Sequence, residues 1–146
     1  MKIHHLLIAA GAISIISASA AEAFDQGQYQ SLKNGQGDCP WCDLSGADLT
    51  NVKLSGVDLG GADLTEANLS GAALTEVDLT GADLTGAVLT GADLSGTDLT
   101  GADLDQVDLS ATVLEGAKLE KAYCDWATRL PEGSGLACIG VTIERK

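Results

Sequence analysis

Leucine recurs at every fifth position over more than half of the chain. Sixteen consecutive units run from Leu44 to Leu119 without a miss. Two residues before each Leu stands a small side chain, and Ser or Thr follows the Leu in twelve of the sixteen units. Gly stands two residues after the Leu in ten units. Because a period of five fits neither an α-helix nor a β-strand, it predicts short extended pieces joined by turns in which Gly supplies the backbone freedom.

The Ala-Asp-Leu-Thr-Gly units resemble the pentapeptide-repeat family over residues 42–126. The resemblance implies an all-β fold, a right-handed quadrilateral β-helix with four pentapeptides per coil. The sixteen Leu-centred units then make about four coils. Each Leu is expected to stack on the Leu one coil away, so Leu64, Leu84 and Leu104 belong to one inner ladder. At about 4.8 Å per coil the repeat region is a rod about 20 Å long.

The first 23 residues have the pattern of a signal peptide. Lys2 precedes an apolar run from Leu6 to Ile16, which is about eleven residues, whereas about 20 are needed to span a bilayer. Two Ala-x-Ala cleavage patterns follow, and we expect cleavage before Phe24, with cleavage before Ala21 as the alternative. Since no second apolar run follows, the product is expected to be exported, to the periplasm or beyond, and to hold no membrane anchor after cleavage.

The remaining chain divides into a repeat region and two caps. We expect an N-terminal cap at 24–41, the β-helix at 42–126 and a C-terminal cap at 127–146. The segment Phe24–Lys33 is expected to form a short helix over the lower end of the rod, with Asp25 as its N-cap. Large apolar residues of the tail are expected to cover the upper end; these are Trp126, Leu130, Leu136 and Ile139.

All four cysteines lie at the two ends of the repeat region. Cys39 and Cys42 belong to a Cys-Pro-Trp-Cys motif, in which Asp43 stands where c-type haem attachment requires His. The register that the resemblance implies separates this pair from Cys124 and Cys138 by about 19 Å, which disfavours a shared zinc site. Two structural disulfides, Cys39–Cys42 and Cys124–Cys138, are therefore expected in an exported protein. A redox-active Cys39–Cys42 pair and free or intermolecularly paired thiols are the alternatives.

The charge and the residue types exclude several function classes. There are 21 acidic and 8 basic residues, for a formal net charge of -13. A surface without a basic patch excludes nucleic-acid binding through phosphate neutralisation. Both histidines, His4 and His5, lie in the expected signal peptide, so the mature chain has no imidazole for acid–base or nucleophilic chemistry. No phosphate-binding loop or nucleophile-elbow motif is present, so we expect no catalytic residue, cofactor or metal site.

The residue just before each Leu points outward, and it is Asp in ten of the sixteen units. Spacing by twenty residues aligns Asp43, Asp63, Asp83 and Asp103 in one ladder. A second ladder contains Asp58, Asp78, Asp98 and Lys118. Unit charges at this spacing repel by roughly 0.9 kcal/mol per neighbouring pair before salt screening. Three interpretations are open: a solvated face, weak divalent-cation binding through hard oxygen ligands, and recognition of a basic partner.

Together these features predict a non-enzymatic, exported structural or protein-interaction module with an acidic surface and an unidentified, basic protein partner. One alternative is a thiol–disulfide redox function through the Cys39–Cys42 motif. The family resemblance adds a third, mimicry of duplex DNA by an acidic rod that inhibits DNA gyrase. A signal peptide, a short rod and the use of Leu in every unit count against that mimicry.

Overall fold

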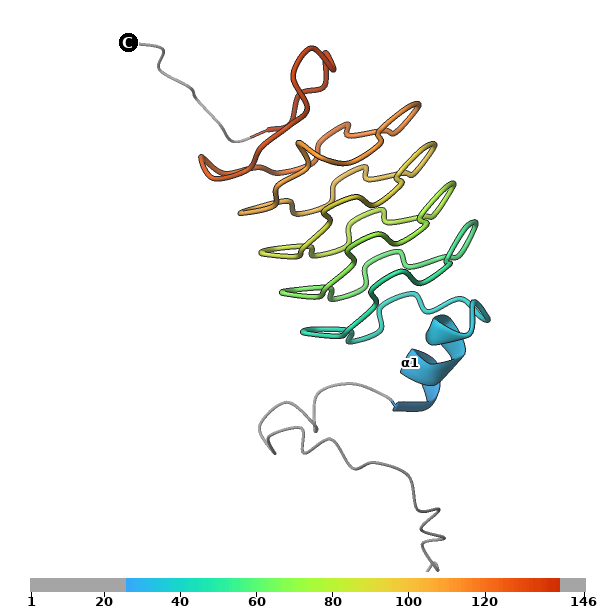
Figure 1. Cartoon of the computed structure of the whole chain (residues 1–146). Coiled ribbons are helices and arrows are strands. Elements are labelled where there is room, and N and C mark those ends of the chain that lie inside the picture. The colour runs from blue at the N-terminus through green and yellow to red at the C-terminus, as the bar shows by residue number, and fades with distance from the viewer. Residues whose placement is uncertain (1–25, 140–146) are drawn as a thin grey trace, which may run out of the picture.

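Segments twenty residues apart lie side by side and pair through parallel β-bridges. Asp63, for example, is bridged to Asp43 below it and to Asp83 above it. The amide of Leu64 donates to the carbonyl of Asp83 at 2.7 Å, and the amide of Asp83 donates to the carbonyl of Ala62 at 3.0 Å. This computed structural model describes residues 26–139, so the expected signal peptide and the Asp25 cap lie outside the described residues. Figure 1 shows the chain as a stack of coils, a β-helix solenoid.

Within residues 26–139 the bridges are isolated, and no run of residues is long enough to form an extended strand. A turn interrupts the backbone every five residues, because the amide three residues after each Leu donates back to its carbonyl. The amide of Ala67, for example, donates to the carbonyl of Leu64 at 2.9 Å. The β-structure therefore runs along the stack of coils rather than along the chain.

The residue two after each Leu, which we call the corner residue, adopts a left-handed backbone. The ten corner glycines do so, in accord with the sequence-based expectation of their role. So do the non-glycine corner residues Asn51, Glu66, Glu76, Gln106 and Lys121, with φ between 57° and 63°. Ala111 is the one corner residue of the repeats without a left-handed backbone. At this corner both the hydroxyl and the amide of Thr112 donate to the carbonyl of Leu109.

The core of the solenoid consists of stacked leucines and the small residues beside them. Fifteen of the sixteen repeat leucines are buried, and Leu114 alone is only partly so. Thr97 takes one of the small inward positions, where its buried hydroxyl donates to the carbonyl of Leu74 at 2.6 Å. The inward assignment predicted from the period of five is thus correct, with Leu114 as the weak point.

Helix α1, Gln26–Lys33, covers the lower end of the stack (Figure 1). Its Leu32 is buried, and the hydroxyl of Tyr29 donates to the carbonyl of Asp48 at 2.9 Å. The helix ends through Gly35, which has φ +67° and donates its amide to the carbonyl of Leu32 at 2.8 Å. The expected short helix is therefore present. No helix among residues 26–139 is long and apolar enough to cross a membrane.

The register of twenty ends at Tyr123. Arg129 pairs with Asp108, 21 residues away, and Ile139 pairs with Tyr123, 16 residues away. A cavity of about 410 Å³ remains between the last coil at residues 112–117 and the loop at residues 131–136. The loop covers this end only loosely, which explains why Leu114 is not fully buried.

Two residues that the sequence analysis assigned to the upper cover do not cover it. The side chain of Trp126 is 88% exposed and that of Ile139 is 52% exposed. Ile139 occupies an outward position directly above Tyr123, and Trp126 lies in the turn that Asp125 begins. Leu130 and Leu136 do pack against the core, as expected.

Candidate interaction surface

The first acidic column is Asp43, Asp63, Asp83 and Asp103, and the structure stacks these residues in one continuous line of bridges. The side chains lie on the outside of the coils, exposed at Asp63 and Asp83 and half-buried at Asp43 and Asp103. The bridge partner above Asp103 is Tyr123, so the column ends in an aromatic residue.

Each carboxylate of this column is also part of the turn that follows it. One oxygen of Asp63 accepts the amide of Thr65 at 3.0 Å and its hydroxyl at 2.6 Å. Asp83 likewise accepts the amide of Thr85 at 2.9 Å. The sequence analysis missed these bonds, although the signal was present: Asp followed two residues later by Ser or Thr is the pattern of a local side-chain-to-backbone turn.

The same local bonds occur in the other columns and shift the acid strength of the carboxyl groups. The hydroxyl of Thr50, followed by its amide, holds the pKa of Asp48 below its ordinary value of 3.8. The hydroxyl and amide of Ser95 lower the pKa of Asp93 in the same way. Ser110 lowers the pKa of Asp108, to which the nearby charge of Arg129 also contributes. These three Asp residues are therefore stabilised as carboxylates by the turns that they help to form.

The second acidic column consists of Asp58, Asp78, Asp98 and Lys118, again joined by bridges. Lys118 closes it with an ion pair to Asp98 at 3.0 Å. The bond from Thr100 is the largest cause that lowers the pKa of Asp98, and Lys118 adds to it. Asp58 and Asp78 of this column form no ion pair in the part of the chain that the structure describes.

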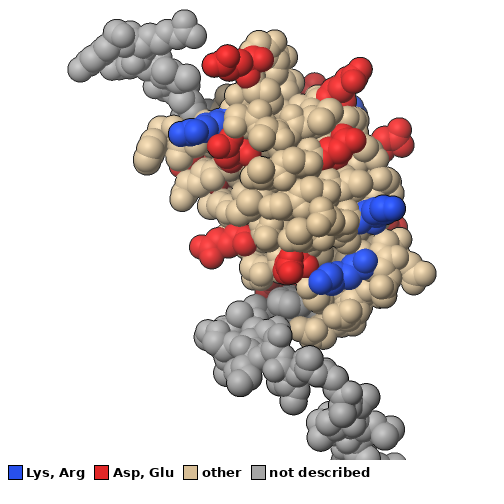
Figure 2. Space-filling model, viewed as in Figure 1, with Lys and Arg blue, Asp and Glu red and all other residues tan. Residues whose placement is uncertain are grey.

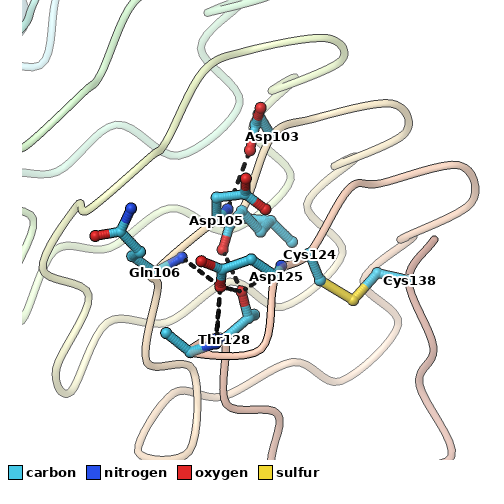
Figure 3. Close-up of a disulfide and its surroundings, with 9 residues drawn as sticks. Asp103, Asp105, Gln106, Cys124, Asp125, Thr128 and Cys138 are labelled. Carbon is cyan, nitrogen blue, oxygen red and sulfur yellow. Dashed lines mark hydrogen bonds between the residues drawn. A yellow bond between two sulfur atoms is a disulfide. The ribbon is translucent and has the colours of Figure 1, made fainter. Parts of the chain in front are cut away.

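Asp105 departs from the repeat pattern, because it stands where twelve units have Ser or Thr. Its side chain makes no hydrogen bond or ion pair within residues 26–139. Partial burial is the main cause that raises the pKa of Asp105, and the charges of Asp103, Asp125 and Asp83 raise it further. Figure 3 shows Asp103, Asp105 and Asp125 close together beside the Cys124–Cys138 disulfide.

These carboxylates do not form a preformed metal centre. No group of three or more His, Cys, Asp or Glu residues within 26–139 is arranged to hold a metal ion. Figure 2 shows Asp and Glu side chains projecting singly over the coils, with a few Lys and Arg side chains between them. The surface thus carries separate carboxylates rather than a set of ligands arranged around one ion.

The repeat pattern also matches known proteins. The family model described as pentapeptide repeats matches residues 42–81 and 72–110, in 8 copies. A pentapeptide repeat protein of the Arabidopsis thaliana thylakoid lumen is 32% identical, with a TM-score of 0.52, and the match covers 64% of this chain and 68% of that one. The chain belongs to the pentapeptide-repeat family.

Other members share the repeat over different lengths. HetL of the cyanobacterium Nostoc, described as involved in heterocyst differentiation regulation, is 33% identical, with a TM-score of 0.53. That match covers 68% of this chain but only 51% of HetL. A second Nostoc pentapeptide repeat protein is 42% identical, with a TM-score of 0.43, over 73% of this chain and 82% of that one. No curated protein matches the chain.

In this pentapeptide-repeat protein the cysteines lie in two pairs at opposite ends of the stack. Cys39 and Cys42 have Cα atoms 5.5 Å apart, and Cys124 and Cys138 have Cα atoms 5.8 Å apart, each pair joined as a disulfide. Cys39 and Cys42 are only 3% and 7% exposed, next to the buried Leu32 of α1. An external thiol therefore has little access to the Cys-Pro-Trp-Cys motif, which counts against the redox alternative.

Proposed function

We propose that this protein is an exported, non-enzymatic interaction module that binds a basic partner protein through its two acidic columns. Pentapeptide-repeat proteins are typically structural or interaction modules rather than enzymes. The observation that carries the proposal is the arrangement of Asp43, Asp63, Asp83 and Asp103 as one outward line, exposed at Asp63 and Asp83. Asp58, Asp78 and Asp98 of the second acidic column stand five residues before Asp63, Asp83 and Asp103, so the two columns flank the same corner of the solenoid.

The shape of that corner supports binding by a partner. Its corner residues are Gly61, Gly81 and Gly101, which have no side chains; the ring of Trp41 lies against Gly61, whereas the space outside Gly81 and Gly101 is open. A basic segment can therefore approach both columns at once. Stacked carboxylates on a rigid frame raise the local potential and favour association with a positive partner.

Export and oxidising surroundings complete the proposal. The signal-peptide pattern at residues 1–23 supports export, and cysteines paired at both ends are typical of proteins outside the cytosol. The thylakoid-lumen relative is likewise a protein of a compartment beyond a membrane. The four-coil length, in turn, suits a short, stable platform rather than an extended mimic of duplex DNA.

Capture from an envelope extract tests this function. Wild-type protein is compared with the double variant Asp63→Asn/Asp83→Asn, in which the Asn side chains can still accept the local turn bonds. The matched control Asp48→Asn/Asp108→Asn removes the same charge from another column. We expect the wild type and the control to retain basic proteins. The Asp63→Asn/Asp83→Asn variant should not retain these proteins, and high salt should release them from the wild type. Equal retention by all three proteins would refute the proposal.

A further inference from the structure

Three large apolar side chains are exposed on the two chain segments that lie at the upper end of the first acidic column. Tyr123 is 54% exposed, Ile139 is 52% exposed and Trp126 is 88% exposed. Tyr123 and Ile139 are bridge partners, and Trp126 follows Tyr123 by three residues. Exposed aromatic residues that the core does not need are typical of binding hot spots.

The backbone that carries these three side chains is held rigidly. The amide of Ile139 donates to the carbonyl of Ala122 at 2.7 Å, and the amide of Cys124 donates to the carbonyl of Ile139 at 3.0 Å. The Cys124–Cys138 disulfide joins the same two segments (Figure 3). The carboxylate of Asp125 fixes the turn after it, accepting the amides of Ala127 and Thr128 at 2.9 and 3.0 Å. Because little ordering is needed, binding at this surface loses little conformational entropy.

The charge beside these side chains indicates what they bind. Asp103, Asp105 and Asp125 lie together here, and neither of the ion pairs among residues 26–139 involves any of them. At Asp105 the repeat pattern calls for a hydroxyl that would donate to Asp103, and the chain has a repelling carboxylate instead. A residue that departs from the repeat pattern at a cost to stability, with no compensating contact of its side chain among residues 26–139, points to a role in binding.

We propose that Tyr123, Trp126 and Ile139, with the carboxylates of Asp105 and Asp125, form a docking patch for an arginine- or lysine-bearing segment of the partner protein. The cationic group lies over an aromatic ring and pairs with the carboxylates, while the aliphatic part of its side chain contacts Ile139. This inference rests on the proposed function and adds where on the acidic surface the basic partner is anchored.

The test measures binding of a fluorescent peptide with four arginines to the full chain by anisotropy, with the same peptide carrying citrulline as the neutral control. Each patch variant has a partner elsewhere on the rod: Asp105→Asn is matched by Asp78→Asn, and Trp126→Ala by Trp41→Ala. We expect the arginine peptide to bind and the citrulline peptide not to bind. Asp105→Asn and Trp126→Ala should each weaken binding at least about fivefold, and the two matched variants less than about twofold.

Three results would overturn the patch. The first is that the arginine peptide does not bind to the wild type. The capture experiment described above then decides separately whether the proposed function holds. Equal weakening by Asp105→Asn and Asp78→Asn with no effect of Trp126→Ala is the second, which leaves a diffuse acidic surface and the proposed function intact. The third is that millimolar calcium, but not magnesium, displaces the peptide from the wild type and has no such effect on Asp105→Asn. That result would assign the carboxylates to a metal ion.

Discussion

The carboxylate of Asp125 takes the place of a backbone carbonyl for the amide of Gln106, which donates to it at 3.0 Å. One coil below, the equivalent amide of Gly86 donates to the backbone carbonyl of Asp105 at 2.9 Å. The hydroxyl of Thr128 similarly donates to the carbonyl of Leu104 at 2.8 Å. The side chain of Asp125 thus maintains the hydrogen-bond ladder where one extra residue shifts the register before Arg129, and Thr128 adds a further bond to the coil below.

Asp125→Ala is expected to destabilise the upper end, because the amides of Gln106, Ala127 and Thr128 lose their common acceptor. Asp125→Asn keeps an acceptor oxygen and should lose much less. Urea unfolding measures both variants. Equal unfolding midpoints for the two would contradict the role of the oxygen as a substitute carbonyl.

Leu84→Ala is expected to cost about 2–5 kcal/mol, because the fully buried side chain leaves a cavity between neighbouring coils. Leu114→Ala, the same change at the same repeat position, should cost clearly less, because Leu114 is already partly exposed beside the upper cavity. Denaturant unfolding of both variants checks this ranking. A larger loss at Leu114 would mean that the upper end is more tightly closed than the structure shows.

Gly81→Ala is expected to cost about 1–2 kcal/mol, although no atom lies within 4 Å of the added Cβ, because φ is +65°. Gly61→Ala should cost more, since its Cβ would lie 2.3 Å from the ring of Trp41. In a Trp41→Ala background the two glycine substitutions should become equal. A persistent difference there would show that the ring contact is not the cause.

Asp105→Asn is expected to raise the thermal midpoint near neutral pH. The raised pKa of Asp105 means that its charge costs stability above the folded pKa, and that this penalty disappears as the pH falls below the ordinary value of 3.8. The advantage of the variant should therefore vanish at about pH 3. Thermal melts across this range provide the measurement, and an advantage that persists at low pH would have a cause other than charge.

The ladder of Leu64, Leu84 and Leu104 was predictable because the sixteen equal spacings resemble the pentapeptide-repeat family, and that resemblance implies four repeats per coil. The alignment of the first acidic column followed from the same spacing. These features depend only on the repeat, and the repeat can be recognised in the amino-acid sequence.

The two ends were less predictable, because each is built from residues that occur once. The shift of register before Arg129 accompanies the replacement of a backbone acceptor by the carboxylate of Asp125, and no sequence period predicts it. Trp126 and Ile139 are exposed, so their assignment to the cover was wrong. The bonds from Thr65 to Asp63 repeat along the chain, but hydrophobic periodicity does not report hydrogen bonds.

The central claim is that outward aspartates build the turns of the solenoid as hydrogen-bonded carboxylates and still leave the surface acidic. Bonds within the following turn lower the folded pKa of Asp48, Asp93, Asp98 and Asp108, and the amide of Gln106 is the main cause that lowers the pKa of Asp125. A depressed pKa gives stability that is present above the unfolded value of about 4 and is lost as the pH falls through the folded value. The direct test is the free energy of unfolding of the wild type, measured by urea at low salt from about pH 6 to about pH 2. The account predicts a plateau above about pH 5 and a steady decline below about pH 4. A rise in stability on acidification would show that repulsion between the columns outweighs the turn bonds, and would contradict it.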